Sequence, residues 1–217
     1  MKKLQSGFGG TTAPLRNIRR SQYGKQTTFF PSKKNGKLII CEVRLEADAC
    51  FHWEHDKDIV SYCAQPERLQ LEVDGRLKTY VPDFKITYVD SSTKFVEIKP
   101  DNVFFKPNYL SLYRAAREFL NSRGEEFELF TESKIRLQPK LNNLIKTYSQ
   151  ARGVESLERA YLRDQLSRLK APMKIGDLLA LPSPPSPASI SAALFDQELR
   201  CDWCQPISSN SQVYWGN

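Results

Sequence analysis

The sequence predicts an α/β fold in which a central mixed β-sheet is flanked by helices. Short strand-like runs crowd into the middle of the chain, and helix-like patterns stand before and after them. The 217 residues, 40% of them hydrophobic, can also supply one main core and a small second module. We therefore expect a basic arm over residues 1–36, a core domain over 37–152 and a smaller module over 153–217.

The predicted arm is rich in glycine and proline and shows little apolar periodicity. Residues 1–40 contain nine lysine and arginine residues and no acidic residue, in a chain with a formal charge of +7. A basic arm on a nearly neutral body is typical of proteins that bind a polyanion such as DNA. A soluble tail with incidental charge is the open alternative.

The first half of the core domain is predicted to be one helix followed by hairpins. Apolar side chains recur every four residues from Cys41 to Trp53, which is the spacing of an amphipathic helix. Asp74-Gly75 between two alternating runs is a strong signal for a two-residue hairpin turn. The strands expected in this region are residues 59–63, 69–73, 77–81, 84–89 and 94–99.

The second half of the chain alternates between helices and short strands. Asn108 is the expected N-cap of a helix that ends before Gly124. A strand over 127–130 and helices around 141–148 and over 155–170 should follow. Short helices over 175–181 and 188–195, and a hairpin formed by 199–203 and 212–215, complete the outline of a winged-helix-like module.

The chemistry is concentrated where two predicted strands meet. Asp83 ends the run Val81-Pro82-Asp83, and the return strand carries Glu97 and Lys99. Residues two apart on a strand point to the same face, so Glu97 and Lys99 share a face while Val96 and Ile98 enter the core. The hairpin can bring Asp83 beside Glu97. Two carboxylates and a lysine suit a divalent cation that holds a phosphate oxygen and activates a water molecule.

These residues carry a resemblance to a known family. The spaced segments RLEAD, QPERLQLEVDGRLKTYVPDF and VEIKP are similar to the PD-(D/E)xK nucleases. More closely, residues 14–150 resemble TnsA, the endonuclease subunit of heteromeric transposons, including those associated with CRISPR systems. The resemblance implies a restriction-endonuclease-like core whose catalytic motif falls on Glu46, Asp83, Glu97 and Lys99.

Each of these four residues has an expected role in the chemistry. Asp83 and Glu97 should bind the metal directly, and Glu46 should complete the metal shell or hold a metal-bound water. TnsA proteins can carry glutamine where this chain has Glu97. Lys99 should orient the attacking water or neutralise charge at the phosphorus. Because the site is rich in carboxylates, the expected metal is Mg²⁺, with Mn²⁺ as a substitute.

Other readings of these residues stay open. Asp83 could cap a turn, and Glu97 with Lys99 could form a solvated strand face. Glu46 could be a surface residue, and Glu42, one turn earlier, competes for its role. Gln65 could approach the site or only shape a turn with Pro66. A zinc site built from His52, His55, Cys201 and Cys204 is disfavoured, because the pairs are far apart in the sequence.

The expected substrate is double-stranded DNA. Arg16, Arg19, Arg20 and Lys25 of the arm are the best candidates for phosphate contacts, and Lys78 and Lys106 flank the proposed site. The resemblance implies that the chain cuts the 5′ strand at transposon ends, beside a TnsB-like transposase and a TnsC-like AAA+ regulator. The alternatives are a stand-alone restriction-type or junction-resolving nuclease and a non-catalytic DNA-binding assembly module.

The C-terminal module is the expected partner contact. Trp203, Pro206, Tyr214 and Trp215 fit either an interaction surface or core packing. No signal-peptide pattern or long apolar stretch occurs in the sequence, and the five cysteines are expected to be reduced thiols. The expected location is therefore the bacterial cytoplasm, in association with the nucleoid.

Overall fold

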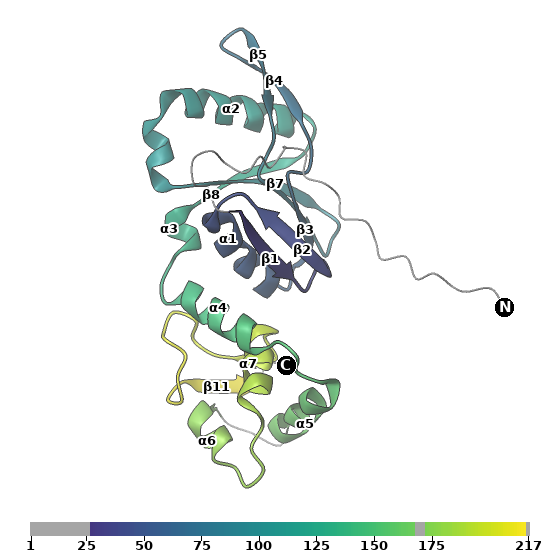
Figure 1. The fold of residues 1–217 in the computed structure, drawn as a ribbon, viewed down its shortest axis with the longest axis vertical. Helices are drawn as coiled ribbons and strands as arrows, with labels where there is room; N and C mark the ends of the chain where they lie inside the picture. The colour runs from purple at the N-terminus through teal and green to yellow at the C-terminus, as the bar shows by residue number, and fades with distance from the viewer. Residues whose placement is uncertain (1–26, 168–171, 216–217) are drawn as a thin grey trace, which may run out of the picture.

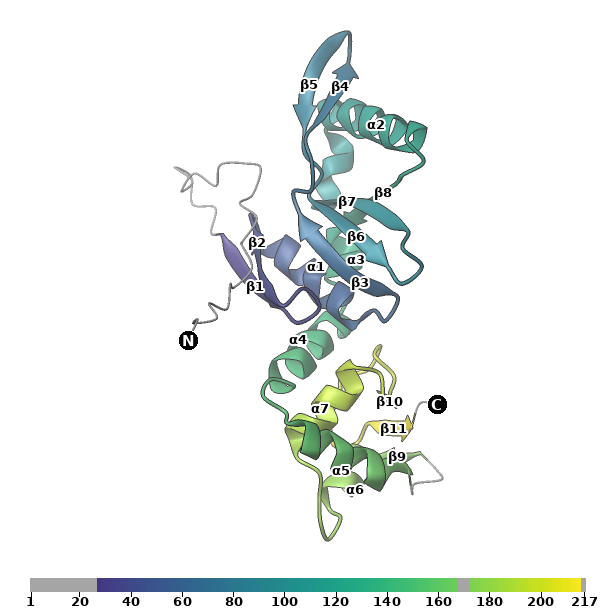
Figure 2. The ribbon, with the colours of Figure 1, turned by 90° about the vertical axis from the view of Figure 1, so that its right-hand side faces the viewer.

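A computed structural model describes residues 27–167 and 172–215. The molecule is elongated, with the core domain at one end and the C-terminal module at the other (Figures 1 and 2). Within the part of the chain that is described, no helix is long and apolar enough to cross a membrane.

A four-stranded sheet forms the centre of the core domain. Its order is β3 (Ile59–Ala64), β6 (Phe84–Tyr88), β7 (Thr93–Lys99) and β8 (Glu126–Thr131). The first two pairings are antiparallel and the β7–β8 pairing is parallel, so the sheet is mixed, as predicted. Parallel neighbours require a crossover connection, which η1 (Asp101–Phe105) and α2 (Pro107–Ser122) supply.

A second hairpin projects from the end of the core domain beside α2 (Figure 1). It consists of β4 (Leu69–Val73) and β5 (Arg76–Tyr80), and β4 alternates between buried and exposed residues as predicted. Asp74 and Gly75 have φ angles of 53° and 70°, the positive pair that a type I′ turn requires. The buried face of β4 packs against Ala116 and Leu120 of α2.

The boundaries of α2 differ slightly from the prediction. Lys106 rather than Asn108 is the N-cap, because Pro107 takes the first helical position, where its missing N–H costs no hydrogen bond. Gly124 has a φ of 74° directly beyond the end of the helix, so it is the expected stop.

The predictions for the N-terminal region are wrong in two respects. Residues 28–32 do not belong to an arm, because they form β1 (Thr28–Ser32), which pairs antiparallel with β2 (Lys37–Cys41). The first helix, α1 (Arg44–His55), begins after Cys41. Cys41 faces the core from a strand, and its four-residue distance from Leu45 imitates helical periodicity. Residues 1–26 lie outside the described part of the chain.

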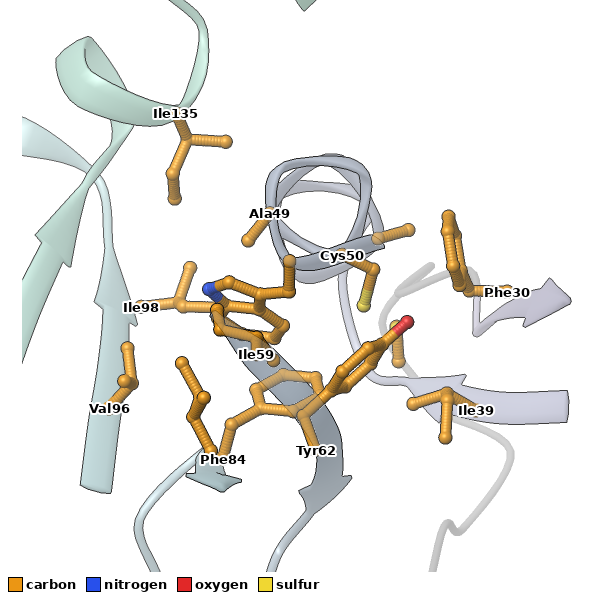
Figure 3. Packing of buried hydrophobic residues seen from close by; sticks show 14 of the residues in the cluster. Phe30, Ile39, Ala49, Cys50, Ile59, Tyr62, Phe84, Val96, Ile98 and Ile135 are labelled. Atoms are coloured by element: carbon orange, nitrogen blue, oxygen red, sulfur yellow. The ribbon is translucent and has the colours of Figure 1, made fainter. Parts of the chain in front are cut away.

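The main core lies between α1, the β1–β2 hairpin and one face of the central sheet. Figure 3 shows Ala49 and Cys50 of α1 directed toward this space. The sheet contributes Phe84, Val96 and Ile98, all at most 3% exposed. The predicted inward direction of Val96 and Ile98 is therefore confirmed, and it fixes which residues of β7 remain for the opposite face.

The C-terminal module has the order of elements expected of a winged helix. Its helices are α5 (Ser156–Ser167), α6 (Ile175–Leu179) and α7 (Pro187–Phe195). A small antiparallel sheet has the order β10 (Leu199–Arg200), β11 (Gln212–Trp215) and β9 (Met173–Lys174). The sequence predicted these helices and the hairpin, and the structure adds β9.

The two ends of the molecule share buried surface. After α3 (Glu132–Ile135), α4 (Lys140–Gln150) runs between the core domain and α7 (Figure 2). Phe195 of α7 is 2% exposed and belongs to the main core. Trp203 packs against the apolar clusters of both parts, and its backbone oxygen accepts a hydrogen bond from Asn143 Nδ2 at 3.1 Å. Core packing therefore accounts for Trp203, whereas Tyr214 is 47% exposed.

One buried carboxylate fastens the β1–β2 turn to the core. Glu54 is 6% exposed and accepts hydrogen bonds from several donors. These donors are the Ser32 and Tyr62 hydroxyls and the backbone amides of Lys33 and Lys34. Because buried donors are costly when they lose their acceptor, this carboxylate should contribute strongly to stability.

We expect Glu54→Ala to lower the free energy of unfolding by roughly 3 kcal/mol or more, because it leaves several buried donors without an acceptor. Urea denaturation measures the change. The matched control is Glu72→Ala on the exposed face of β4, which should shift stability by less than about 0.5 kcal/mol. A loss below 1 kcal/mol for Glu54→Ala would contradict this role.

Candidate active site

Asp83 is held at the start of β6 by contacts with two other segments. Its backbone oxygen accepts a hydrogen bond from the amide of Gln65 at 2.8 Å. Its carboxylate oxygen Oδ2 accepts one from the amide of Ile98, also at 2.8 Å. The register of the hairpin pairs Phe84 with Val96, which brings Asp83 to the end of β7 that carries Glu97. The acid is therefore fixed against the neighbouring strand.

A lysine ammonium group joins the two acids predicted to share this place. Lys99 Nζ lies 2.6 Å from Glu97 Oε1 and 3.1 Å from Asp83 Oδ2. The Lys99 side chain is 28% exposed, whereas those of Asp83 and Glu97 are only 6% and 4% exposed. Burial lowers the pKa of Lys99, but the charges of Asp83 and Glu97 outweigh it, so the pKa is raised and the amine stays protonated.

Tyr80 is a site residue that the sequence reasoning missed. It ends β5, and its buried hydroxyl donates a hydrogen bond to Glu97 Oε2 at 2.5 Å. Burial raises the pKa of Glu97, the charge of Asp83 raises it further, and Lys99 and Tyr80 oppose both effects. The only sequence signal was a tyrosine at the end of an alternating strand, which by itself indicates a core residue.

Glu46 approaches the same group from the first turn of α1. Its carboxylate oxygen Oε2 accepts a hydrogen bond from the backbone amide of Glu42 at 2.7 Å, and the residue is 8% exposed. Burial raises the pKa of Glu46 to about 8, with a further contribution from the charge of Asp83. Glu46 therefore lies within electrostatic range of the pair held by Lys99.

The competing residue, Glu42, makes a different contact. Its Oε1 accepts a hydrogen bond from Gln65 Nε2 at 2.6 Å. Gln65 is itself buried and adopts a φ of 50°, a conformation that is uncommon for residues other than glycine. Gln65 thus contacts Asp83 through its backbone and Glu42 through its side chain, so it both shapes the turn and borders the site.

The burial of Glu97 and Glu46 excludes the two alternatives in which these acids face solvent. A solvated strand face would leave its carboxylate largely exposed, but Glu97 is only 3% exposed. A plain surface position for Glu46 is excluded in the same way. The hydrogen bond from Ile98 to Asp83 crosses between two strands, so Asp83 is not simply the cap of its own turn.

The donor set fits a hard divalent cation. In residues 27–167 and 172–215, no three acidic, histidine or cysteine side chains are already arranged as metal ligands. The Lys99 ammonium lies between Asp83 and Glu97, where it partly neutralises both. Three buried carboxylates nevertheless share a single ammonium, and burial, followed by the charge of Asp83, raises the pKa values of Glu46 and Glu97. Carboxylate oxygens with excess charge are suitable ligands for Mg²⁺.

The predicted DNA-binding residues fall in several places. Lys78 is exposed on β5 of the projecting hairpin, and Lys106 is exposed at the start of α2. Arg16, Arg19, Arg20 and Lys25 lie outside the described residues.

The histidines of the disfavoured zinc site contact backbone oxygens: His52 Nε2 lies 2.8 Å from Ile135 O, and His55 Nδ1 lies 2.8 Å from Phe195 O.

A mixed sheet flanked by helices, with two acids and a lysine where adjacent strands meet, defines the restriction-endonuclease-like class. Residues 56–132 match the family model described as TnsA-like endonuclease N terminal. This segment is therefore similar to the N-terminal domain of TnsA-like endonucleases. The match includes Asp83, Glu97 and Lys99 but not Glu46 or the C-terminal module. No curated protein matches the chain.

The raised pKa of Glu46 predicts how stability depends on pH in chelator. In the unfolded chain this carboxyl ionises near its ordinary pKa of 4.5, but in the folded chain only near 8. Between these values folding favours the protonated form, so the wild-type chain loses stability as pH rises. Glu46→Gln removes this dependence. The variant should match the wild type at pH 4.5 and exceed it by up to a few kcal/mol at pH 8, each pKa unit being worth about 1.4 kcal/mol.

Urea denaturation of both proteins across this pH range, in chelator, measures the difference. Glu125→Gln provides a control carboxyl outside the site. A stability difference between Glu46→Gln and the wild type that does not change with pH would show that Glu46 is not held in its protonated form.

Proposed function

We propose that this chain is a metal-dependent DNA endonuclease subunit of a heteromeric transposase, which cuts the 5′ strand at transposon ends. The observation that carries the proposal is the buried pair Asp83 and Glu97 held by Lys99. Its proposed partners are a TnsB-like transposase, which makes the 3′ cut, and a TnsC-like AAA+ regulator. The bacterial cytoplasm, in contact with the nucleoid, is the location that suits such an activity.

In this proposal Asp83, Glu97 and Glu46 hold the cation, with Mg²⁺ preferred and Mn²⁺ acceptable. When bound, the cation supplies an activated water and a counter-charge for a phosphate oxygen. The Ile98 amide fixes the direction of Asp83, and the Tyr80 hydroxyl fixes that of Glu97. These two donors hold the carboxylates in place before the reaction begins, which reduces the cost of reorganisation.

Lys99 contributes a positive charge beside the phosphate that is cut. Its raised pKa keeps the ammonium protonated at neutral pH, so it donates hydrogen bonds and cannot act as a base. Charge accumulates on the phosphate oxygens in the transition state, and a fixed ammonium stabilises that charge more than the ground state. The side chain is partly exposed, which gives a substrate phosphate access to it.

Affinity for DNA is proposed to come from basic side chains outside this cluster. Arg16, Arg19, Arg20 and Lys25 would contact phosphates, with help from Lys78 and Lys106. Such contacts carry no sequence information, so the choice of transposon end falls to the transposase partner.

We expect Asp83→Asn and Lys99→Ala each to reduce cleavage of transposon-end DNA at least 100-fold. Asp83→Asn removes a charged ligand of the cation, and Lys99→Ala removes the positive charge beside the reacting phosphate. Affinity for DNA should change less than tenfold. Strand-specific cleavage of labelled DNA in Mg²⁺ and in chelator measures the first effect. Asp90→Asn and Lys94→Ala, at the other end of the same hairpin, are matched controls that should cut normally. Full cutting by either site variant would refute the assignment.

The same assay with and without transposase separates the alternatives. Cutting that requires the transposase supports the proposed subunit, whereas cutting by the isolated chain indicates a restriction-type or junction-resolving nuclease. No metal-dependent cutting in any complex would identify a non-catalytic assembly module.

Replacing Arg16, Arg19, Arg20 and Lys25 together by alanine should weaken DNA binding and flatten its dependence on salt. Each lost phosphate contact lowers the slope of log K against log salt by about 0.9, so four contacts lower it by up to about 3.6. Fluorescence anisotropy over a range of salt concentrations measures the slope. An unchanged slope would assign the arm no role in binding DNA.

A further inference from the structure

A second tyrosine near the cluster has no assigned role. Tyr109 lies in the first turn of α2, the helix that follows the strand carrying Lys99. Its hydroxyl oxygen is buried and, among the described residues, has no hydrogen-bond partner. A buried hydroxyl without a partner is costly and uncommon in folded proteins, so its retention requires an explanation.

The position of Tyr109 relative to the acids explains why its hydroxyl has no partner within the described part of the chain. Lys99 Nζ lies 5.9 Å from the centre of the Tyr109 ring, which places the ring next to the ammonium that holds Asp83 and Glu97. Burial raises the pKa of Tyr109, and the charges of Glu97 and Asp83 raise it further. The group is therefore a protonated hydroxyl at neutral pH and is suited to donate a hydrogen bond rather than to accept a proton.

Aromatic packing holds this ring in place. The Tyr109 ring stacks on that of Tyr113 with centres 6.2 Å apart, and Tyr113 lies 5.2 Å from Phe127 of β8. Phe127 in turn lies 6.3 Å from Tyr80, whose hydroxyl contacts Glu97. One row of aromatic rings thus supports both tyrosines, but of these two hydroxyls only that of Tyr80 has a hydrogen-bond partner among the described residues.

We infer that the Tyr109 hydroxyl donates a hydrogen bond to a non-bridging oxygen of the DNA phosphate that is cut. The inference rests on the proposed nuclease function and adds a substrate contact to it. The hydroxyl is buried in the absence of DNA, so the contact requires the side chains that cover it to shift when a phosphate binds beside Lys99. The phosphate then supplies the anionic acceptor that the hydroxyl lacks. The hydrogen bond strengthens as negative charge grows on that oxygen, so Tyr109 stabilises the transition state without transferring a proton.

The test is Tyr109→Phe in the complex assembled with transposase on labelled transposon-end DNA. We expect the single-turnover rate of 5′-strand cleavage to fall roughly 100-fold, the usual cost of removing one such donor. Tyr113→Phe is the matched control, one turn further along α2, and should cut within twofold of the wild type. Urea denaturation should find Tyr109→Phe at least as stable as the wild type, because no internal hydrogen bond is lost.

A binding cycle tests the contact independently of cutting. In chelator, Tyr109→Phe should weaken binding to DNA by up to about tenfold. The loss should vanish when the phosphate at the cut position is replaced by a neutral methylphosphonate. Equal weakening on both DNAs, a wild-type cleavage rate, or a marked loss of stability would each overturn the inference. A wild-type chain that never cuts would refute the proposed function, while the cycle would still decide whether Tyr109 contacts the phosphate.

Discussion

The ammonium of Lys99 is the interaction on which the arrangement of the site depends. It lies within 3.1 Å of two carboxylates that are almost completely buried. Without that charge, two anions held together away from water would repel each other, and at least one would bind a proton. The ammonium therefore allows strands β6 and β7 to present acids at the same place, while their other faces pack into the main core.

The elements around Lys99 hold the neighbouring carboxylates in place. The Ile98 amide and the Tyr80 hydroxyl each bind one carboxylate, and α1 brings Glu46 within electrostatic range of Asp83. Glu97 lies in β7 and Asp83 directly precedes β6, so the pairing of these two strands sets their relative positions. Groups supported by strands and helices keep their geometry better than groups on free loops, which suits a site that must be ready for its substrate.

The sequence predicted most of the central sheet because period-two alternation and the Asp74-Gly75 turn are local signals. It also predicted that Asp83 would lie beside Glu97, since a short hairpin leaves little freedom of register. The predicted start of the first helix was wrong. Cys41 lies in β2, but it precedes Leu45 by four residues, which is also the spacing of apolar residues in a helix. Tyr80 and Tyr109 were missed for a different reason. A buried tyrosine usually indicates packing, and whether its hydroxyl has a partner depends on residues far away in the chain.

The burial of α7 limits what the C-terminal module can do. In helix-turn-helix proteins that read DNA sequence, the recognition helix enters the major groove. Here residues 189–195 of the equivalent helix are buried, and α4 packs along it. This helix cannot insert into a groove unless the module first separates from the rest of the chain. Because α7 packs against α4 and α4 packs against α1, the module shares buried surface with the core domain instead of presenting a free recognition helix.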